Sequence, residues 1–257
     1  MAEEQASPEN VLFEYALRLG DDRLILGHRL SEWCGHGPIL EEDIALANIA
    51  LDLLGGATHA LEVAAAAEAA GRSADDLAYF RETVEFRNLL LVELPRGDFA
   101  YTIARQFFFD AYSVHLMDAL SKSKEPKLAE LAAKAVKEDR YHVRHSAEWM
   151  VKLGDGTDES HARLQNAVND LWRYTGEMFL SDPTDEAAAS AEIAPAAPAL
   201  KEKWNAVVDD VLARATISRP TDEVFMRGGR AGRHTEHLGH LLAEMQIVAR
   251  SHPGAEW

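Results

Sequence analysis

The chain has 257 residues, and its 43 acidic and 26 basic side chains give a formal net charge of −17 at pH 7. This charge repels nucleic-acid phosphates and anionic lipid surfaces, so we expect no nucleic acid and no membrane as partner. The single cysteine, Cys34, excludes an intramolecular disulfide framework and is expected to be inert.

Apolar residues recur with a helical period along most of the chain, which predicts an all-α fold. The length suits one large domain or two small ones, and we expect one domain over residues 1–257. The first helix is expected over about 8–34, with Ser7 as its N-cap. A second helix is expected over about 39–70, where two glycines, Gly55 and Gly56, would permit close contact with a neighbouring helix.

The next segment is predicted to form one helix that begins at a capping box of Ser73 and Asp76 and ends near Leu94. Two more helices are expected over about 98–121 and 126–153, as an antiparallel pair. Together with the first two helices, this pair is predicted to form a four-helix core.

The remainder, about 160–250, is predicted to add helices outside that core. An Ala/Pro/acidic stretch over 181–199 is expected to be a surface excursion rather than a domain boundary. The expected helices cover about 161–180, 200–215 and 235–250.

Four aspartates fall on or beside the apolar stripes of four different predicted helices, namely Asp22, Asp52, Asp110 and Asp139. His142 follows Asp139 by one helical turn. A di-iron bundle takes a carboxylate from each of two helices and a carboxylate-x-x-His pair from each of two others. The pattern therefore resembles a di-iron carboxylate site.

One of the two pairs is incomplete, because Gly55 stands where the histidine after Asp52 would be expected. Glycine cannot ligate a metal, and aspartate reaches one methylene less far than glutamate. We therefore interpret these positions as a vestigial site that binds no metal. The alternatives are a di-iron oxygenase or ferroxidase in its own right, and a storage protein of the ferritin type.

Burying four uncompensated carboxylates would cost several kcal/mol each, so protons or cations must lie among them. On matching helical faces, the expected cations are Arg29 near Asp22, His59 near Asp52, and His142 itself. Ordinary core acids paired with arginine or histidine would show the same pattern.

The segment from His234 to His240 resembles a metal motif, because His237 and His240 lie one turn apart. It lacks a third ligand, so the start of a helix is the simpler interpretation. The preceding GGRAGR loop, from Gly228, is expected to make a tight turn or to hold a carboxylate. The N-terminal MAEEQASPEN lacks the basic and apolar pattern of a secretion signal, which favours a cytoplasmic protein.

Long strings along the chain are more specific than any of these short patterns. They are YALRLGDDRLILGHRLSEWCGHGP from Tyr15, DIALANIALDLLG from Asp43, NLLLVELPRGDFAYTIARQFFFDAY from Asn88, KAVKEDRYHVRHS from Lys134 and GGRAGRHTEHLGHLLAEMQ from Gly228. Through them nearly the whole chain resembles the C subunits of bacterial phenylacetyl-CoA 1,2-epoxidases, the ring-epoxidising phenylacetate-CoA oxygenases.

The resemblance implies a ferritin-like four-helix bundle with additional C-terminal helices. It also implies a structural subunit without iron, paired with a homologous catalytic A subunit that carries the di-iron centre and the phenylacetyl-CoA site. A small B subunit and a reductase subunit that delivers electrons from NADPH would join them. The isolated chain is expected to self-associate, for example as a homodimer, or to lose stability. Gly55 agrees with the non-catalytic role, whereas Asp139 beside His142 departs from a fully stripped site.

Overall fold

The computed structural model describes residues 8–221 and 224–255, and within these ranges it contains helices and loops but no strand. This confirms the all-α prediction. Four long helices form the core, as expected, and Ser7 lies outside the described residues. The core helices are α1 (Pro8–Ser31), α2 (Leu40–Glu68), α5 (Phe99–Leu120) and α6 (Pro126–Gly154).

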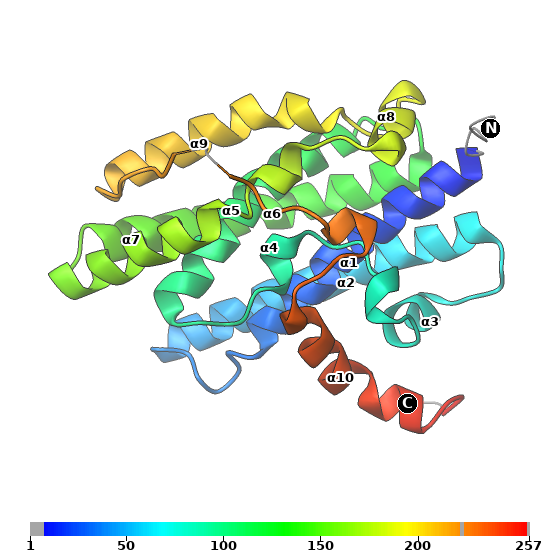
Figure 1. Cartoon of the computed structure of the whole chain (residues 1–257), viewed down its shortest axis with the longest axis horizontal. Helices are drawn as coiled ribbons and strands as arrows, with labels where there is room; N and C mark the ends of the chain where they lie inside the picture. Colours follow the sequence, from blue (N-terminus) through cyan, green and yellow to red (C-terminus); the bar gives the residue numbers. More distant parts are fainter. Residues whose placement is uncertain (1–7, 222–223, 256–257) are drawn as a thin grey trace.

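The core is built from two helix pairs, α1 with α2 and α5 with α6, and α2 also packs against α6 (Figure 1). The helix α5 is buried on nearly every side, because α7 (Asp158–Trp172) and α9 (Lys201–Arg214) cover it from outside the core. Phe108 of α5 meets these two helices through Trp172 and Trp204, with ring centroids 5.6 and 6.0 Å away. Burial of these aromatic rings ties the outer helices to the bundle.

The segment predicted as one helix up to Leu94 is broken, so that prediction is wrong. The capping box of Ser73 and Asp76 does open a helix, but this helix is short. The observed elements are α3 (Ala74–Tyr79), the 3₁₀ turn η1 (Thr83–Glu85) and α4 (Leu90–Glu93).

Carboxylates from other elements explain the break. The backbone N–H groups of Arg87 and Leu89 donate to Asp21 and Asp22 of α1, at 2.8 and 2.7 Å. The N–H of Leu90 donates to Glu177, at 2.9 Å. Because these donors are bonded to distant acids, the chain around them stays out of a continuous helix.

The expected helix over 161–180 ends at Trp172, and a 3₁₀ turn, η2 (Gly176–Phe179), follows it. The stretch over 181–199 is not simply a surface excursion, because it contains α8 (Pro183–Ser190) and η3 (Ala197–Leu200), and Ala188 is fully buried. α8 packs against α1.

Arg18 of α1 explains why the 181–199 stretch is held against the bundle. Its guanidinium pairs with Asp182 at 2.6 Å and with Asp185 at 3.2 Å. The acidic residues of this stretch suggested a solvated segment, but two of them, Asp182 and Asp185, attach it to α1.

The C-terminal part consists of the turn η4 (Gly229–Ala231) and α10 (Glu236–Ser251). The helix α10 projects away from the bundle and packs against α3 and η1 (Figure 1). Thr235 is its N-cap residue, which agrees with a helix start in the histidine-rich segment.

Among the described helices, α2 alone is long and apolar enough, by length and composition, to cross a membrane. A buried core helix of a soluble protein meets the same criteria. In this chain, 44% of the most apolar window of α2 is buried. Because α2 packs against α1 and α6 and carries Asp52 in its middle, its place in the bundle accounts for much of this apolar character. The absence of a membrane partner stays a prediction.

Candidate functional site: a buried polar cluster in the four-helix core

A buried arginine, Arg23 of α1, lies at the centre of the polar groups in the core, and only 2% of it is exposed. Its Nη2 donates to Oδ2 of Asp139 at 2.9 Å and to Oγ of Ser113 at 3.0 Å. Gly56 of α2 makes room for it, since an added Cβ there would lie 3.1 Å from Cδ of Arg23. The close approach predicted for the glycine pair therefore occurs at Gly56, whereas the space around Gly55 is open.

Asp139 of α6 is held by two donors. Besides the arginine, Ser113 of α5 donates its hydroxyl to Oδ2 of Asp139 at 2.6 Å. Arg23 and Asp139 are each 2% exposed at the side chain, so this is a fully desolvated ion pair. Removing either partner of such a pair would leave an unpaired charge in the core and would destabilise the fold.

Asp110 of α5 is bound by neutral groups instead. Gln106 donates to Oδ1 at 2.7 Å, and Ser146 donates to Oδ2 at 2.8 Å. Burial raises the pKa of Asp110 well above its usual range, and the negative charge of Asp139 raises it further. The surroundings of Asp110 therefore favour its protonated form.

His142 of α6 links the cluster to the surface. Its Nε2 lies 3.0 Å from Oδ2 of Asp52, and its Nδ1 lies 3.8 Å from Oδ1 of Asp139. The side chain of Asp52 is 39% exposed, whereas that of His142 is 1% exposed. Burial lowers the pKa of His142, so its ring is neutral at pH 7.

The structure thus brings together four of the five expected positions. We call this group the core cluster. Its members are Arg23, Asp52, Gln106, Asp110, Ser113, Asp139, His142 and Ser146.

Asp22, the fifth position, is 2% exposed and binds different partners. Arg230, in the GGRAGR loop, donates to its two carboxylate oxygens at 3.1 and 2.8 Å, and the N–H of Leu89 donates at 2.7 Å. Burial raises the pKa of Asp22, and Arg230 opposes that rise. The loop therefore both turns and holds a carboxylate, which combines the two alternatives predicted for it.

Three more buried acids share this arrangement, in which arginines, backbone N–H groups or a histidine hold an acid. We call the acids and their donors the loop network. Its acids are Asp21, Asp22, Glu93 and Glu177, and its charged or titratable donors are Arg81, Arg230 and His234.

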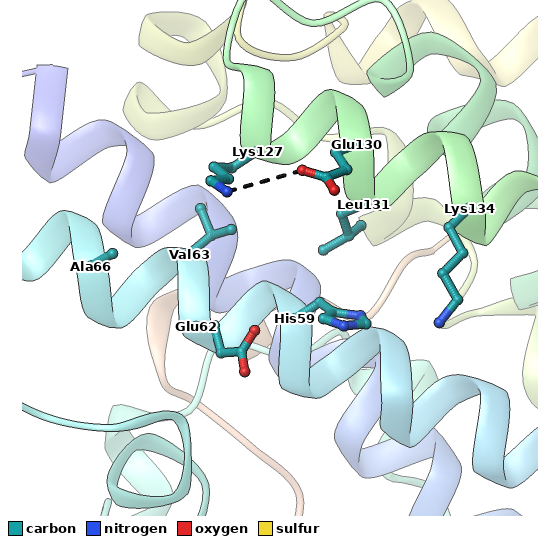
Figure 2. Close-up of a pocket in the computed structure, with 8 residues that line it drawn as sticks. All are labelled: His59, Glu62, Val63, Ala66, Lys127, Glu130, Leu131 and Lys134. Atoms are coloured by element: carbon teal, nitrogen blue, oxygen red, sulfur yellow. Dashed lines mark ion pairs between the residues drawn. The ribbon is translucent and has the colours of Figure 1, made fainter.

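The predicted counter-ions Arg29 and His59 are wrong. The guanidinium of Arg29 donates to the carbonyl oxygens of Glu93 and His237, at 2.9 Å each from Nη2. His59 is exposed and lines a groove of about 570 Å³ between α2 and α6, which it enters from the side opposite Lys134 (Figure 2). Helical angle alone placed both residues near the acids, but their side chains extend to other neighbours.

Arg23 and Arg230, which pair with Asp139 and Asp22, were not predicted as the partners of these acids from the sequence. A signal for Arg23 existed, because it lies four residues after Leu19 and seven before Leu30, on the apolar face of α1. No local signal placed Arg230 beside Asp22, because that contact joins positions 208 residues apart.

The histidine-rich segment makes an ion pair rather than a metal centre. Nδ1 of His234 lies 2.7 Å from Glu93, its Nε2 lies 3.0 Å from the carbonyl oxygen of Phe86, and the N–H of Thr235 donates to Glu93 at 2.6 Å. Burial opposes protonation of His234, but its bond to Glu93 raises the pKa above the ordinary value. The segment therefore fixes the start of α10 against α4.

The donor set of the core cluster does not fit a di-iron centre. Asp139 is engaged by a guanidinium, Asp110 by an amide and a hydroxyl, and Asp52 by His142. In the part of the chain that the structure describes, no group of three or more His, Cys, Asp or Glu side chains is arranged to hold a metal ion. A cation of the protein itself stands among the carboxylates.

Known proteins match the chain along its length. A family model described as phenylacetic acid catabolic protein matches residues 1–257. The chain is also similar to the C subunit of 1,2-phenylacetyl-CoA epoxidase from Escherichia coli (strain K12), with 50% identity over 249 residues, which are 96% of this chain and 100% of that relative. The chain therefore belongs to the phenylacetic acid catabolic protein family.

Proposed function

We propose that this chain is a structural subunit of a multicomponent phenylacetyl-CoA 1,2-epoxidase in aerobic phenylacetate catabolism. It holds a homologous di-iron subunit in its active form and performs no chemistry itself. Similarity to a relative named as the C subunit of such an epoxidase, over that relative's whole length, supports the place in the complex.

The observation that carries the structural role is the position of Arg23. Its guanidinium bonds Asp139 in a desolvated core, and the positive charge replaces the one that a metal ion would supply. For a metal ion to bind Asp139, this guanidinium would have to leave its buried position.

The proposed partners follow from this role. The catalytic A subunit holds the di-iron centre and binds phenylacetyl-CoA, while a small B subunit and a reductase subunit make up the rest of the complex. In this proposal the present chain is cytoplasmic and carries no cofactor.

A catalytic di-iron protein is the second candidate. The observations in its favour are that Asp139 and His142 keep the i, i+3 spacing of a ligand pair, and that Nδ1 of His142 is buried without a hydrogen-bond partner among the described residues. In that case Arg23 would have to leave the core when iron binds.

Turnover by reconstituted complex separates the two candidates. We expect the isolated chain to turn over no phenylacetyl-CoA, and Asp110→Asn combined with wild-type catalytic subunit to retain turnover within about twofold, a change of about 0.4 kcal/mol in the barrier. Size-exclusion chromatography confirms equal assembly. Complete loss of turnover by a normally assembled Asp110→Asn complex would contradict the structural role.

A further inference from the structure

One face of α2 is apolar and bare. Leu40, Ile44 and Leu51 are 72%, 53% and 66% exposed, and their spacing places them on the same side of the helix. Gly55 continues this face, and a Cβ added there would have no neighbour within 4 Å. We call these four residues the α2 stripe.

The rest of α2 explains why the stripe is expected to bind a partner. Its opposite side, including Leu46, Leu53 and Ala60, is fully buried in the bundle, so α2 is apolar on both sides. The buried side already supplies the contact of α2 with the bundle, and a further exposed apolar patch marks an interaction site. The open space at Gly55 lets another helix approach closely.

The edge of the stripe toward α6 is acidic. Asp52 follows Leu51, and its side chain is 39% exposed. Glu138 is half-buried on α6, which packs against α2. Burial and then the charge of Asp52 raise the pKa of Glu138, while Lys134 and Arg23 only partly oppose that rise. This like-charge pair is repulsive in the isolated chain. A positive charge from outside would relieve it.

An aromatic side chain adds to the same edge. Tyr141 of α6 is 43% exposed, and its ring is stacked on that of His145 with centroids 6.2 Å apart. His145 in turn bonds Glu42 of α2 at 2.8 Å, which places Tyr141 at the seam between α2 and α6. Partly exposed tyrosine is enriched at protein interfaces.

We infer that the α2 stripe, with Tyr141 and the acids Asp52 and Glu138, docks an amphipathic helix of a different subunit that places lysine or arginine beside these acids. A second copy of this chain is a poor occupant, because each copy has a net charge of −17 and would bring its own acids to the contact. A lipid surface is also a poor occupant, because acids flank the stripe.

The inference rests on the proposed function, since the catalytic subunit is the partner expected to supply that helix. It adds a location. The contact lies over Asp52 and His142, where the core cluster reaches the surface. The desolvated pair of Arg23 and Asp139 lies beneath this contact, in a close-packed core that keeps the docking surface rigid.

Binding of purified catalytic subunit to immobilised variants of this chain tests the location. Leu51→Glu should weaken binding by roughly 30-fold or more, because it places a charge in the middle of the contact. The matched control is Val248→Glu on α10, where the valine is 55% exposed, and it should stay within about threefold of wild type. Circular dichroism melts check the folding of each variant.

Leu40→Glu keeps the test decisive if Leu51→Glu does not fold. Leu40 is the first residue of α2, where an acidic side chain favours the helix, and we expect this variant also to weaken binding by roughly 10-fold. Raising the salt concentration should weaken wild-type binding, because part of the contact is between opposite charges.

Each outcome has one meaning. If wild-type chain does not bind the catalytic subunit, the proposed function fails. If it binds and the folded Leu40→Glu and Leu51→Glu variants bind equally well, the function stands and this location is wrong. A homodimer in light scattering that persists with excess catalytic subunit present and that Leu51→Glu abolishes would show that a second copy occupies the stripe, which would overturn the inference. Flotation with zwitterionic phosphatidylcholine vesicles that Leu51→Glu abolishes would do the same for a membrane.

Discussion

The core cluster and the loop network both bury several carboxylates, but they satisfy them differently. Among the described residues of the core cluster, side chains bond Asp110 and Asp139, because the helical backbone around these acids bonds to itself. In the loop network much of the bonding comes from backbone N–H groups of irregular segments. Glu177, for example, accepts from the N–H groups of Gly228 and Gly229, at 2.7 and 2.9 Å.

The loop network is therefore an architectural device. Asp21 accepts from both Nη atoms of Arg81 and from the N–H of Arg87. It therefore fixes the non-helical segment around Arg87, whose N–H is not bonded within a helix. Gly229 shows how tightly these segments meet, because an added Cβ would lie 2.0 Å from the carbonyl oxygen of Asn88. Buried acids beside irregular backbone act here as substitutes for helical hydrogen bonds.

The difference teaches how to interpret acids on helical stripes. Asp22 and Asp139 both lie on or beside an apolar helical stripe, yet one organises a loop and the other balances a core arginine. Spacing placed both acids at these stripes, but only the location of their donors tells the two roles apart. Substitutions of the donors should therefore have different effects in the two regions.

The largest effect is expected from Arg23→Met. It leaves Asp139 as an unpaired charge in a desolvated site and should lower the free energy of unfolding by about 3–5 kcal/mol. Urea unfolding followed by circular dichroism measures it. The double variant Arg23→Met/Asp139→Asn should recover most of the loss, because it removes both charges, and a lack of recovery would mean that Arg23 has another role.

Arg230→Met should be less severe, with a loss of about 2–3 kcal/mol. Asp22 keeps the N–H of Leu89, and the side chain of Arg230 is 18% exposed, so water can reach part of the site.

Rescue should also differ between the two regions. Arg230 also donates to the carbonyl oxygen of Arg87 at 2.7 Å, a bond that no change at Asp22 restores. Adding Asp22→Asn should therefore recover only part of the loss in urea unfolding. Complete recovery would show that the loop network depends on the ion pair alone.

Asp110→Asn should be neutral to stabilising, with a sign that depends on pH. Burial raises the pKa of Asp110 in the folded state, so its favourable contribution is complete below the unfolded pKa of about 3.9 and is lost as the pH rises through the folded pKa. The asparagine variant should thus gain about 1 kcal/mol or more over wild type between pH 4 and pH 8 in urea melts. A relative loss over that range would contradict this assignment.

The smallest expected effect is a difference in pKa between the histidines of the two regions, His142 and His234. The pKa of His142 is lowered by burial, so its stabilising contribution exists above an unfolded pKa of about 6.5 and is lost as the pH falls. The pKa of His234 is raised by Glu93 despite its burial, so its contribution exists below that pH and is lost as the pH rises through the folded pKa. NMR titration of the two rings should find that His234 protonates at the higher pH, and the reverse order would contradict both environments.

The helical core was predictable from sequence because its apolar period is long and its ends carry clear signals. Pro126 begins α6 as expected, and Asp139 and His142 share its buried face. The segment between Ser73 and Leu94 was not predictable, because the donors that break it bind acids more than 60 residues away.

The candidate site was predictable in part. Helical spacing located Asp110, Asp139 and His142, because a stripe fixes which side chains point inward. It did not identify Arg23, because helical angle assigned the cations to Arg29 and His59, and the contact of Arg23 with Asp139 joins two helices far apart in the chain. It assigned close contact to Gly55 and Gly56 together, whereas of the two it is Gly56 that makes the contact, because one residue changes the direction of a side chain by about 100°.

Iron loading tests the central claim most directly, namely that Arg23 takes the place of a metal in the core. Wild-type chain is incubated with Fe(II) without oxygen, desalted and analysed for metal and for absorption after oxygen is admitted. We predict well below one iron per chain and no oxo-bridge absorption. About two irons per chain with that absorption would contradict the claim, because two metal ions could not share the core with the guanidinium that bonds Asp139.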